Sequence, residues 1–217
     1  MAQFFVMLKQ FAAKKFPNLN NMNMKKFSLL AVAVCAAIIT KAQHPHWGVK
    51  GGINISDINV ERGSDPDTRV GIHLGGLAHI HLSKHFAVQP ELMYSNQGAE
   101  RRDNRNDYKT KLHYINIPVL LQFMTGSGFR LQTGPQFGVL MGAKYKVNDT
   151  ETDIDDNYKT PDFSWSFGAS YVTRKGLGFD ARYNHGISNI NDNPGNDYRN
   201  RVVQLGVFYQ FRVTEYR

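Results

Sequence analysis

The sequence predicts an all-β fold, an eight-stranded antiparallel transmembrane β-barrel preceded by a cleaved signal peptide. Three observations carry this prediction. Apolar and polar residues alternate in eight segments between residues 46 and 212, the connections between those segments alternate between long and short, and no amphipathic helix interrupts them. A period of two is typical of a strand with one apolar and one polar face, and many such strands in series favour a closed antiparallel sheet.

The alternation is clearest in the C-terminal half of the chain. From Asp162 to Thr173, the odd positions hold Phe163, Trp165, Phe167, Ala169 and Tyr171, whereas the even positions hold serines and a glycine. We expect strands at about 46–57, 69–82, 85–97, 112–124, 128–141, 162–173, 176–187 and 203–212.

The expected connections differ in length in a regular way. Long polar stretches follow the first, third, fifth and seventh strands, at about 58–68, 99–111, 142–161 and 188–199. The other connections are a few residues around Ser83-Lys84, Gly126-Ser127 and Arg174-Lys175. Short turns on one rim and long loops on the other are typical of barrels in bacterial outer membranes.

The composition of the two faces indicates which one points outward. In a lipocalin-like soluble barrel, the polar face would meet water. Here that face is rich in glycine, which weakens an exposed strand but leaves space inside a narrow barrel. The apolar face carries aromatic residues, as the interfacial girdles of membrane barrels do: Trp47, Phe86, Tyr94, Phe123, Phe129, Phe163, Trp165, Tyr183 and Phe211. We therefore expect the apolar face to meet lipid.

The N-terminal region is interpreted as an export signal. Lys25 and Lys26 precede an apolar run, 27–39, which ends at Thr40-Lys41-Ala42. A basic start, a short apolar run and small residues before a cut predict cleavage before Gln43, and the run is too short for a membrane-spanning helix. We expect 24–42 to be the signal peptide, 43–217 to be the barrel, and 1–23 to be an over-extended reading of the gene.

Charge and cysteine content exclude some partners. The whole chain has a formal net charge of +8, but six lysines lie in residues 1–42, which leaves 20 basic against 18 acidic residues in the expected barrel. This balance gives no reason to expect nucleic-acid binding. The single cysteine, Cys35, lies in the expected signal peptide, so no disulfide is expected in the barrel.

Six segments carry recognisable motifs: Gly48–Ser56, Val88–Ser95, Tyr114–Leu121, Thr133–Gly138, Ala181–Ser188 and Gln204–Phe211. Together they resemble the PorT-like outer-membrane β-barrel family of Bacteroidetes. The resemblance extends over nearly all of 46–212 and implies an outer-membrane barrel. It implies less about function, although the member that gives the family its name is associated with protein secretion. Many outer-membrane barrels end on an aromatic residue, whereas this chain continues past Phe211 to Arg217.

The expected inward face carries charges that we interpret as an ion-paired network filling the lumen, since unpaired buried charge is unfavourable. Its members are Lys50, Glu91, Arg130, Asp180, Arg182 and Arg212. A selective polar pore is the alternative, although eight strands leave little free bore.

Other candidate sites are weaker. His73, His79 and His81 share one strand face, but a metal site needs three or four ligands, so we expect lumen hydrogen bonding. His44 and His46 are placed in an N-terminal tail. The acidic stretch from Asp149 to Asp156 lacks the central glycine and the closing glutamate of a calcium loop. Arginines within 100–109 could meet lipopolysaccharide phosphates.

Catalytic, cofactor and metal sites are not expected. His185, Ser188 and Asp192 are close in sequence, but His185 has the lipid-facing parity and no oxyanion hole can be argued. The leading hypothesis is therefore a non-enzymatic scaffold or interaction barrel in protein secretion or envelope assembly. Its expected partners are outer-membrane lipid, lipopolysaccharide, and envelope or secretion proteins that contact the long outer loops. The alternatives are a narrow channel or small-solute transporter, and a lipid-modifying or proteolytic enzyme.

Overall fold

A computed structural model describes residues 45–60, 67–102, 107–148, 150–154, 160–191 and 197–211. All of them belong to one unit, Gln43–Arg217. The expected signal peptide at 24–42, the preceding residues 1–23 and Arg212 lie outside the described residues.

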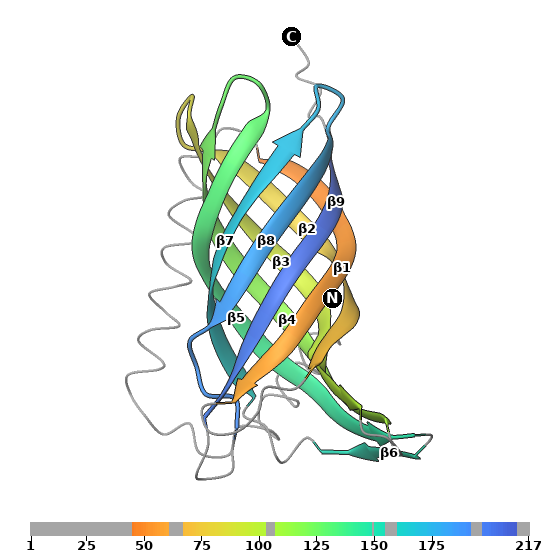
Figure 1. Cartoon of the computed structure of the whole chain (residues 1–217). Helices are drawn as coiled ribbons and strands as arrows, with labels where there is room; N and C mark the ends of the chain where they lie inside the picture. Colours follow the sequence, from red (N-terminus) through yellow and green to blue (C-terminus); the bar gives the residue numbers. More distant parts are fainter. Residues whose placement is uncertain are drawn as a thin grey trace, which may run out of the picture. The chain divides into compact units, whose positions relative to one another are not determined.

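The unit is an antiparallel barrel, as predicted (Figure 1). Its strands are β1 (His46–Val60), β2 (Asp67–His81), β3 (Phe86–Arg102), β4 (Asp107–Met124), β5 (Phe129–Val147), β6 (Thr150–Asp153), β7 (Pro161–Val172), β8 (Leu177–Gly186) and β9 (Tyr198–Gln210). The sheet order is β4-β3-β2-β1-β9-β8-β7-β5-β6, and pairing of β4 with β5 closes a ring of eight strands. The remaining strand, β6, is not part of this ring and pairs only with the end of β5. Among the described residues, no helix is long and apolar enough to cross a membrane.

The three short connections lie at one end of the barrel, the upper end in Figure 1. Two of them share one geometry, in which the amide of a glycine donates to a threonine carbonyl three residues earlier, at 3.3 Å for Gly128 and Thr125 and 3.0 Å for Gly176 and Thr173. Both glycines have a φ of 93°, which a side chain would disfavour. A turn closed by a residue with positive φ is a common hairpin connection, so these glycines determine where the strands reverse.

At the opposite end of the barrel, regular strand structure extends into segments that the sequence predicted to be loops. We expected polar loops at 99–111 and 142–161, but β3 continues to Arg102, β4 starts at Asp107 and β5 runs to Val147. Here the predicted strand ends were wrong by several residues. Strands that extend beyond the apolar belt do not place one face against lipid, so their sequence loses the apolar alternation that identifies a strand.

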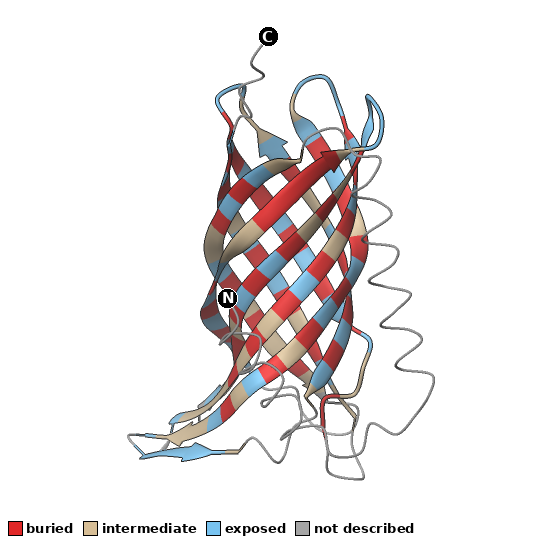
Figure 2. Cartoon of the chain, turned by 180° about the vertical axis from the view of Figure 1, so that it is seen from behind, coloured by how far each residue is buried: buried red, intermediate tan, exposed pale blue. Residues whose placement is uncertain are grey.

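The predicted assignment of faces is confirmed. Burial alternates residue by residue along the strands (Figure 2), for example in the pattern of β8, where every second residue from Gly178 to Gly186 is buried. All nine aromatic residues expected on the apolar face are exposed on the barrel exterior. Most of the buried residues in the middle of the barrel are polar, so the barrel is apolar outside and largely polar inside.

Candidate functional site

The centre of the lumen contains two basic and two acidic side chains from three strands. Lys50 Nζ on β1 donates to Asp180 Oδ2 on β8 at 2.6 Å and lies 3.9 Å from Glu91 Oε2 on β3. Arg182, also on β8, donates to Glu91 through both terminal nitrogens, at 3.0 and 2.8 Å. Each of the four residues is buried. Their formal charges cancel, which is the arrangement that makes buried charge tolerable.

The pair between Arg182 and Glu91 crosses the bore. In the ring of eight strands, three strands separate β3 from β8 in either direction, so the two strands face each other across the lumen. A bidentate guanidinium–carboxylate contact also restricts the relative orientation of the two groups. The lumen is therefore bridged from wall to wall at this level.

Glycine on the inward face provides the space that this network occupies. A Cβ atom built on Gly206 would lie 2.6 Å from Asp180 Oδ1, 3.0 Å from His73 Nε2 and 3.2 Å from Lys50 Cε. Any larger residue at this position would displace the charged groups. The close approach explains why the polar face alternates glycine with long polar side chains.

Arg130 lies apart from the central network. Its guanidinium donates to Gln210 Oε1 at 3.1 Å and lies 3.5 Å from His79 Nδ1. Among the described residues, no carboxylate lies within ion-pair distance of Arg130. The sequence-based set is thus brought together in part: Lys50, Glu91, Asp180 and Arg182 form one cluster, Arg130 belongs to another, and Arg212 lies outside the described residues.

The histidines also gather near the short-turn end. The ring centroids of His79 and His81 are 4.6 Å apart, and His46 lies 5.5 Å from His81. Placing His46 in a tail was wrong, because it is the first residue of β1 and pairs in register with His79. His73 lies deeper and contacts Asn54 Oδ1 through its Nδ1 at 2.8 Å. Within the described part of the chain, no three His, Cys, Asp or Glu side chains are arranged to hold a metal ion.

Sequence reasoning missed an apolar cluster at the long-loop end of the lumen. Its buried members are Ile58, Ala99, Leu112, Tyr114, Leu140, Ala143 and Ile190, with Ile154 and Tyr198 packed against them. Leu112, Tyr114 and Leu140 occupy inward positions that were expected to be polar. Apolar residues at these positions were the sequence signal that could have revealed the cluster. Ile190 follows β8 in a connection and gave no periodic signal. We call this set the apolar cap.

Hydrogen bonds hold the chain after β8 against the barrel. Ile190 N donates to Tyr198 O at 2.9 Å, and Ser188 Oγ donates to Asp162 Oδ1 at 2.7 Å. Asn200 Nδ2 donates to the same carboxylate, at Oδ2, at 2.8 Å. Ile190 therefore reaches the apolar cap from an anchored connection, and the cap forms a second obstruction beyond the ion network.

Comparison with protein families agrees with this architecture. A family model described as "Outer membrane protein beta-barrel domain" matches residues 41–192. The chain belongs to this family. No curated protein matches the sequence.

Solved structures similar to this outer-membrane barrel include Neisserial surface protein A, at 15% identity with a TM-score of 0.52, covering 76% of this chain and 97% of that one. Another is Ail, the attachment invasion locus protein of Yersinia pestis, at 15% identity with a TM-score of 0.51, covering 78% of this chain and all of the other. Similarity at this identity shows the fold alone. Fold and family together place the chain in an outer membrane.

An outward-facing charge in the membrane is expected to destabilise the barrel. Leu205 is exposed on the exterior at the middle of β9, so Leu205→Arg should lower the free energy of unfolding by about 2–4 kcal/mol, the penalty for arginine near the bilayer midplane. Urea unfolding of the protein refolded in lipid vesicles measures this. Leu82→Arg is the control, because Leu82 is exposed in a short turn; an equal loss for both variants would contradict the assigned membrane face.

The two described residues considered for catalysis, His185 and Ser188, have different hydrogen-bond partners. His185 is on the exterior, with its Nδ1 3.4 Å from the hydroxyl of Tyr183, whereas Ser188 donates to Asp162. Asp192 lies outside the described residues. In the expected acidic loop, Asp149, Asp155 and Asp156 also lie outside the described residues, and Glu151 instead pairs with Lys111 and Lys144.

Proposed function

We propose that this protein is a non-enzymatic interaction barrel whose long-loop end contacts other envelope proteins, in protein secretion or envelope assembly. The observation that carries the proposal is the contact between Arg182 and Glu91 across the bore. Because this contact obstructs passage through the lumen, the long-loop end is the surface through which the barrel would act on a partner. The apolar cap adds a second obstruction. The resemblance of the strand motifs to PorT-like barrels supports secretion as the process.

Site-specific photo-crosslinking in growing cells tests this proposal. A crosslinking residue at Thr150 or Thr152 places the probe on β6 at the long-loop end, where both side chains are exposed. The matched control places it at Lys84, exposed in a short turn at the other end. We expect one discrete adduct with an envelope protein, identified by mass spectrometry, from the β6 positions. No adduct, together with single-channel conductance of the unmodified protein, would contradict the proposal.

A narrow polar channel is the second candidate. Among the described lumen residues, His73 Nε2, Asp180 Oδ1 and Arg182 Nε are buried without a hydrogen-bond partner. Buried polar atoms of this kind favour bound water, and a hydrated lumen is what conduction would require. Conductance of the wild-type barrel would favour this candidate.

A further inference from the structure

The long-loop end carries lysines at directly opposed positions of β4 and β5. Lys109 pairs in register with Lys146, and Lys111 pairs with Lys144. Like charges directly opposite each other on a sheet are destabilising. Two successive lysine pairs therefore favour negatively charged groups at this place.

These lysines belong to the outward face of the barrel. On β4 the inward residues are Leu112 and Tyr114, which are fully buried, so Lys109 and Lys111 share the outward parity of Ile117, which is exposed in the apolar belt. Ile115 is the last apolar residue on this outward face, and Lys111 lies four residues beyond it, about 13 Å along the strand at a rise of about 3.3 Å per residue. Lipid headgroups are expected just beyond the apolar belt of a membrane barrel, and lysine stems can extend along such a boundary.

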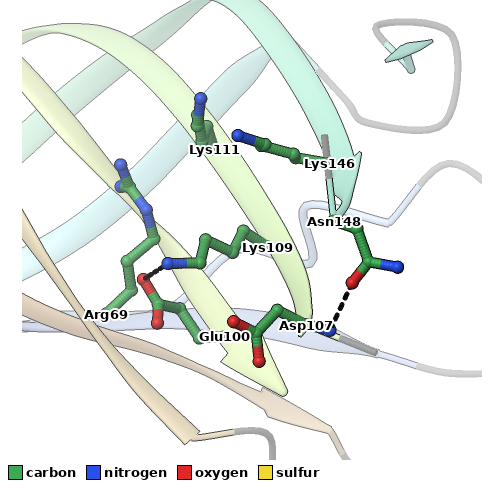
Figure 3. Close-up of a pocket in the computed structure, with 7 residues that line it drawn as sticks. All are labelled: Arg69, Glu100, Asp107, Lys109, Lys111, Lys146 and Asn148. Atoms are coloured by element: carbon green, nitrogen blue, oxygen red, sulfur yellow. Dashed lines mark hydrogen bonds and ion pairs between the residues drawn. The ribbon is translucent and has the colours of Figure 1, made fainter. Parts of the chain in front are cut away.

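A pocket of about 440 Å³ opens among these side chains (Figure 3). It is lined by Arg69, Glu100, Asp107, Lys109, Lys111, Lys146 and Asn148. Four of these residues are basic and two are acidic, so the lining has a net positive charge. We call this site the lysine pocket.

The acidic residues nearby show how an oxyanion is held here. The carboxylate of Glu151 on β6 lies 3.0 Å from Lys111 Nζ and 2.9 Å from Lys144 Nζ. Hydrogen bonds from Lys144 and Lys111 lower the pKa of Glu151 to about 2, so this carboxylate is ionised at neutral pH. Glu100 lies 3.6 Å from Lys109. Glu151 thus competes with any external anion for the same lysines.

We propose that the lysine pocket binds the phosphate groups of an outer-leaflet lipid headgroup. Phosphate offers several strong acceptor oxygens to ammonium and guanidinium donors. The outward position at headgroup depth favours a lipid over a ligand that arrives from solution. This site adjoins the β6 surface proposed above for protein contact, because Glu151 on β6 pairs with Lys111 and Lys144, but lipid binding by the purified barrel is measured without any protein partner.

The test is a titration of the folded barrel in uncharged detergent with bis-phosphorylated lipid A, followed by native mass spectrometry. Lys109→Gln combined with Lys146→Gln should weaken binding about thirty-fold, because each of the two basic residues contributes roughly 1 kcal/mol near a phosphate surface and about 1.4 kcal/mol corresponds to a ten-fold change in affinity. Glu151→Gln should strengthen binding, because it removes the competing carboxylate. The matched control, Lys84→Gln with Lys175→Gln, removes two exposed charges at the other rim and should leave the affinity unchanged.

Two further arms identify the source of the phosphate. The affinity of the wild-type barrel for dephosphorylated lipid A should be as low as the affinity of the double lysine variant for bis-phosphorylated lipid A. Millimolar inorganic phosphate should leave the bound lipid in place. Displacement by inorganic phosphate would overturn the lipid assignment in favour of free phosphate. An equal loss from the Lys84 and Lys175 control would overturn the site itself. Faster migration of unboiled samples on a denaturing gel verifies that every variant is folded.

Discussion

Arg182→Met is expected to lower the free energy of unfolding by about 3–5 kcal/mol, the loss typical when one partner of a buried ion pair is removed. In the wild type, Lys50 and Arg182 balance Glu91 and Asp180, and all four are buried. Removing Arg182 leaves two carboxylates with one lysine in the lumen. Urea unfolding in lipid vesicles measures the change through the fluorescence of Trp47 and Trp165, which are exposed on the exterior.

A double variant provides the matched control. Arg182→Met with Glu91→Met removes the contact but leaves the neutral pair of Lys50 and Asp180, joined at 2.6 Å. This variant should recover most of the lost stability, because exchanging a whole buried pair for apolar residues is often close to neutral. If Arg182→Met alone unfolds at the wild-type urea concentration, the contact across the bore is not a structural element of the lumen.

The second large effect is expected in conductance. The ion network and the apolar cap obstruct the lumen at two levels, so the wild-type barrel should show no single-channel steps in planar bilayers. Glu91→Ser with Arg182→Ser opens the first level, and Tyr114→Ser with Ile190→Gly opens the second. Because two obstructions in series must both be removed, we expect conductance steps only when the four substitutions are combined.

Each pair of substitutions alone serves as the control for the other. Conductance from the ion-network pair alone would show that the apolar cap does not close the lumen. Steps from the wild-type protein would contradict closure altogether and would replace the interaction barrel with the channel as the proposed function. Heat modifiability of each variant on a denaturing gel separates a closed lumen from a failure to fold.

Much of the fold could be predicted because a membrane barrel imposes its environment on every second residue. Phe163, Trp165 and Phe167 alternate with serines and a glycine, and the structure places these two sets outside and inside the barrel. The short turns were predictable because glycine and polar residues are concentrated there. The strand ends near Arg102 and Val147 were not, since the outward faces of those extensions carry polar residues such as Glu100, Lys144 and Lys146 and lose the alternation seen in the apolar belt.

The candidate site was predictable only as a set of residues on one face. Parity assigned Lys50, Glu91, Arg130, Asp180 and Arg182 to the interior, but parity does not say which of them meet. Contact between Arg182 and Glu91 depends on β3 and β8 lying opposite each other in the closed ring. Arg130 shares the same parity, yet it lies beside His79 and Gln210 instead.

The sequence by itself determined the barrel, its outward face and which end carries the short turns and which the long loops, because alternation and connection length are local properties of the chain. Tertiary structure decided how the lumen is closed and where charges converge. Ile190 reaches the apolar cap from a connection, and Lys109 meets Lys146 only through the register of β4 on β5. Both depend on contacts between residues far apart in sequence, which no periodic pattern along the chain encodes.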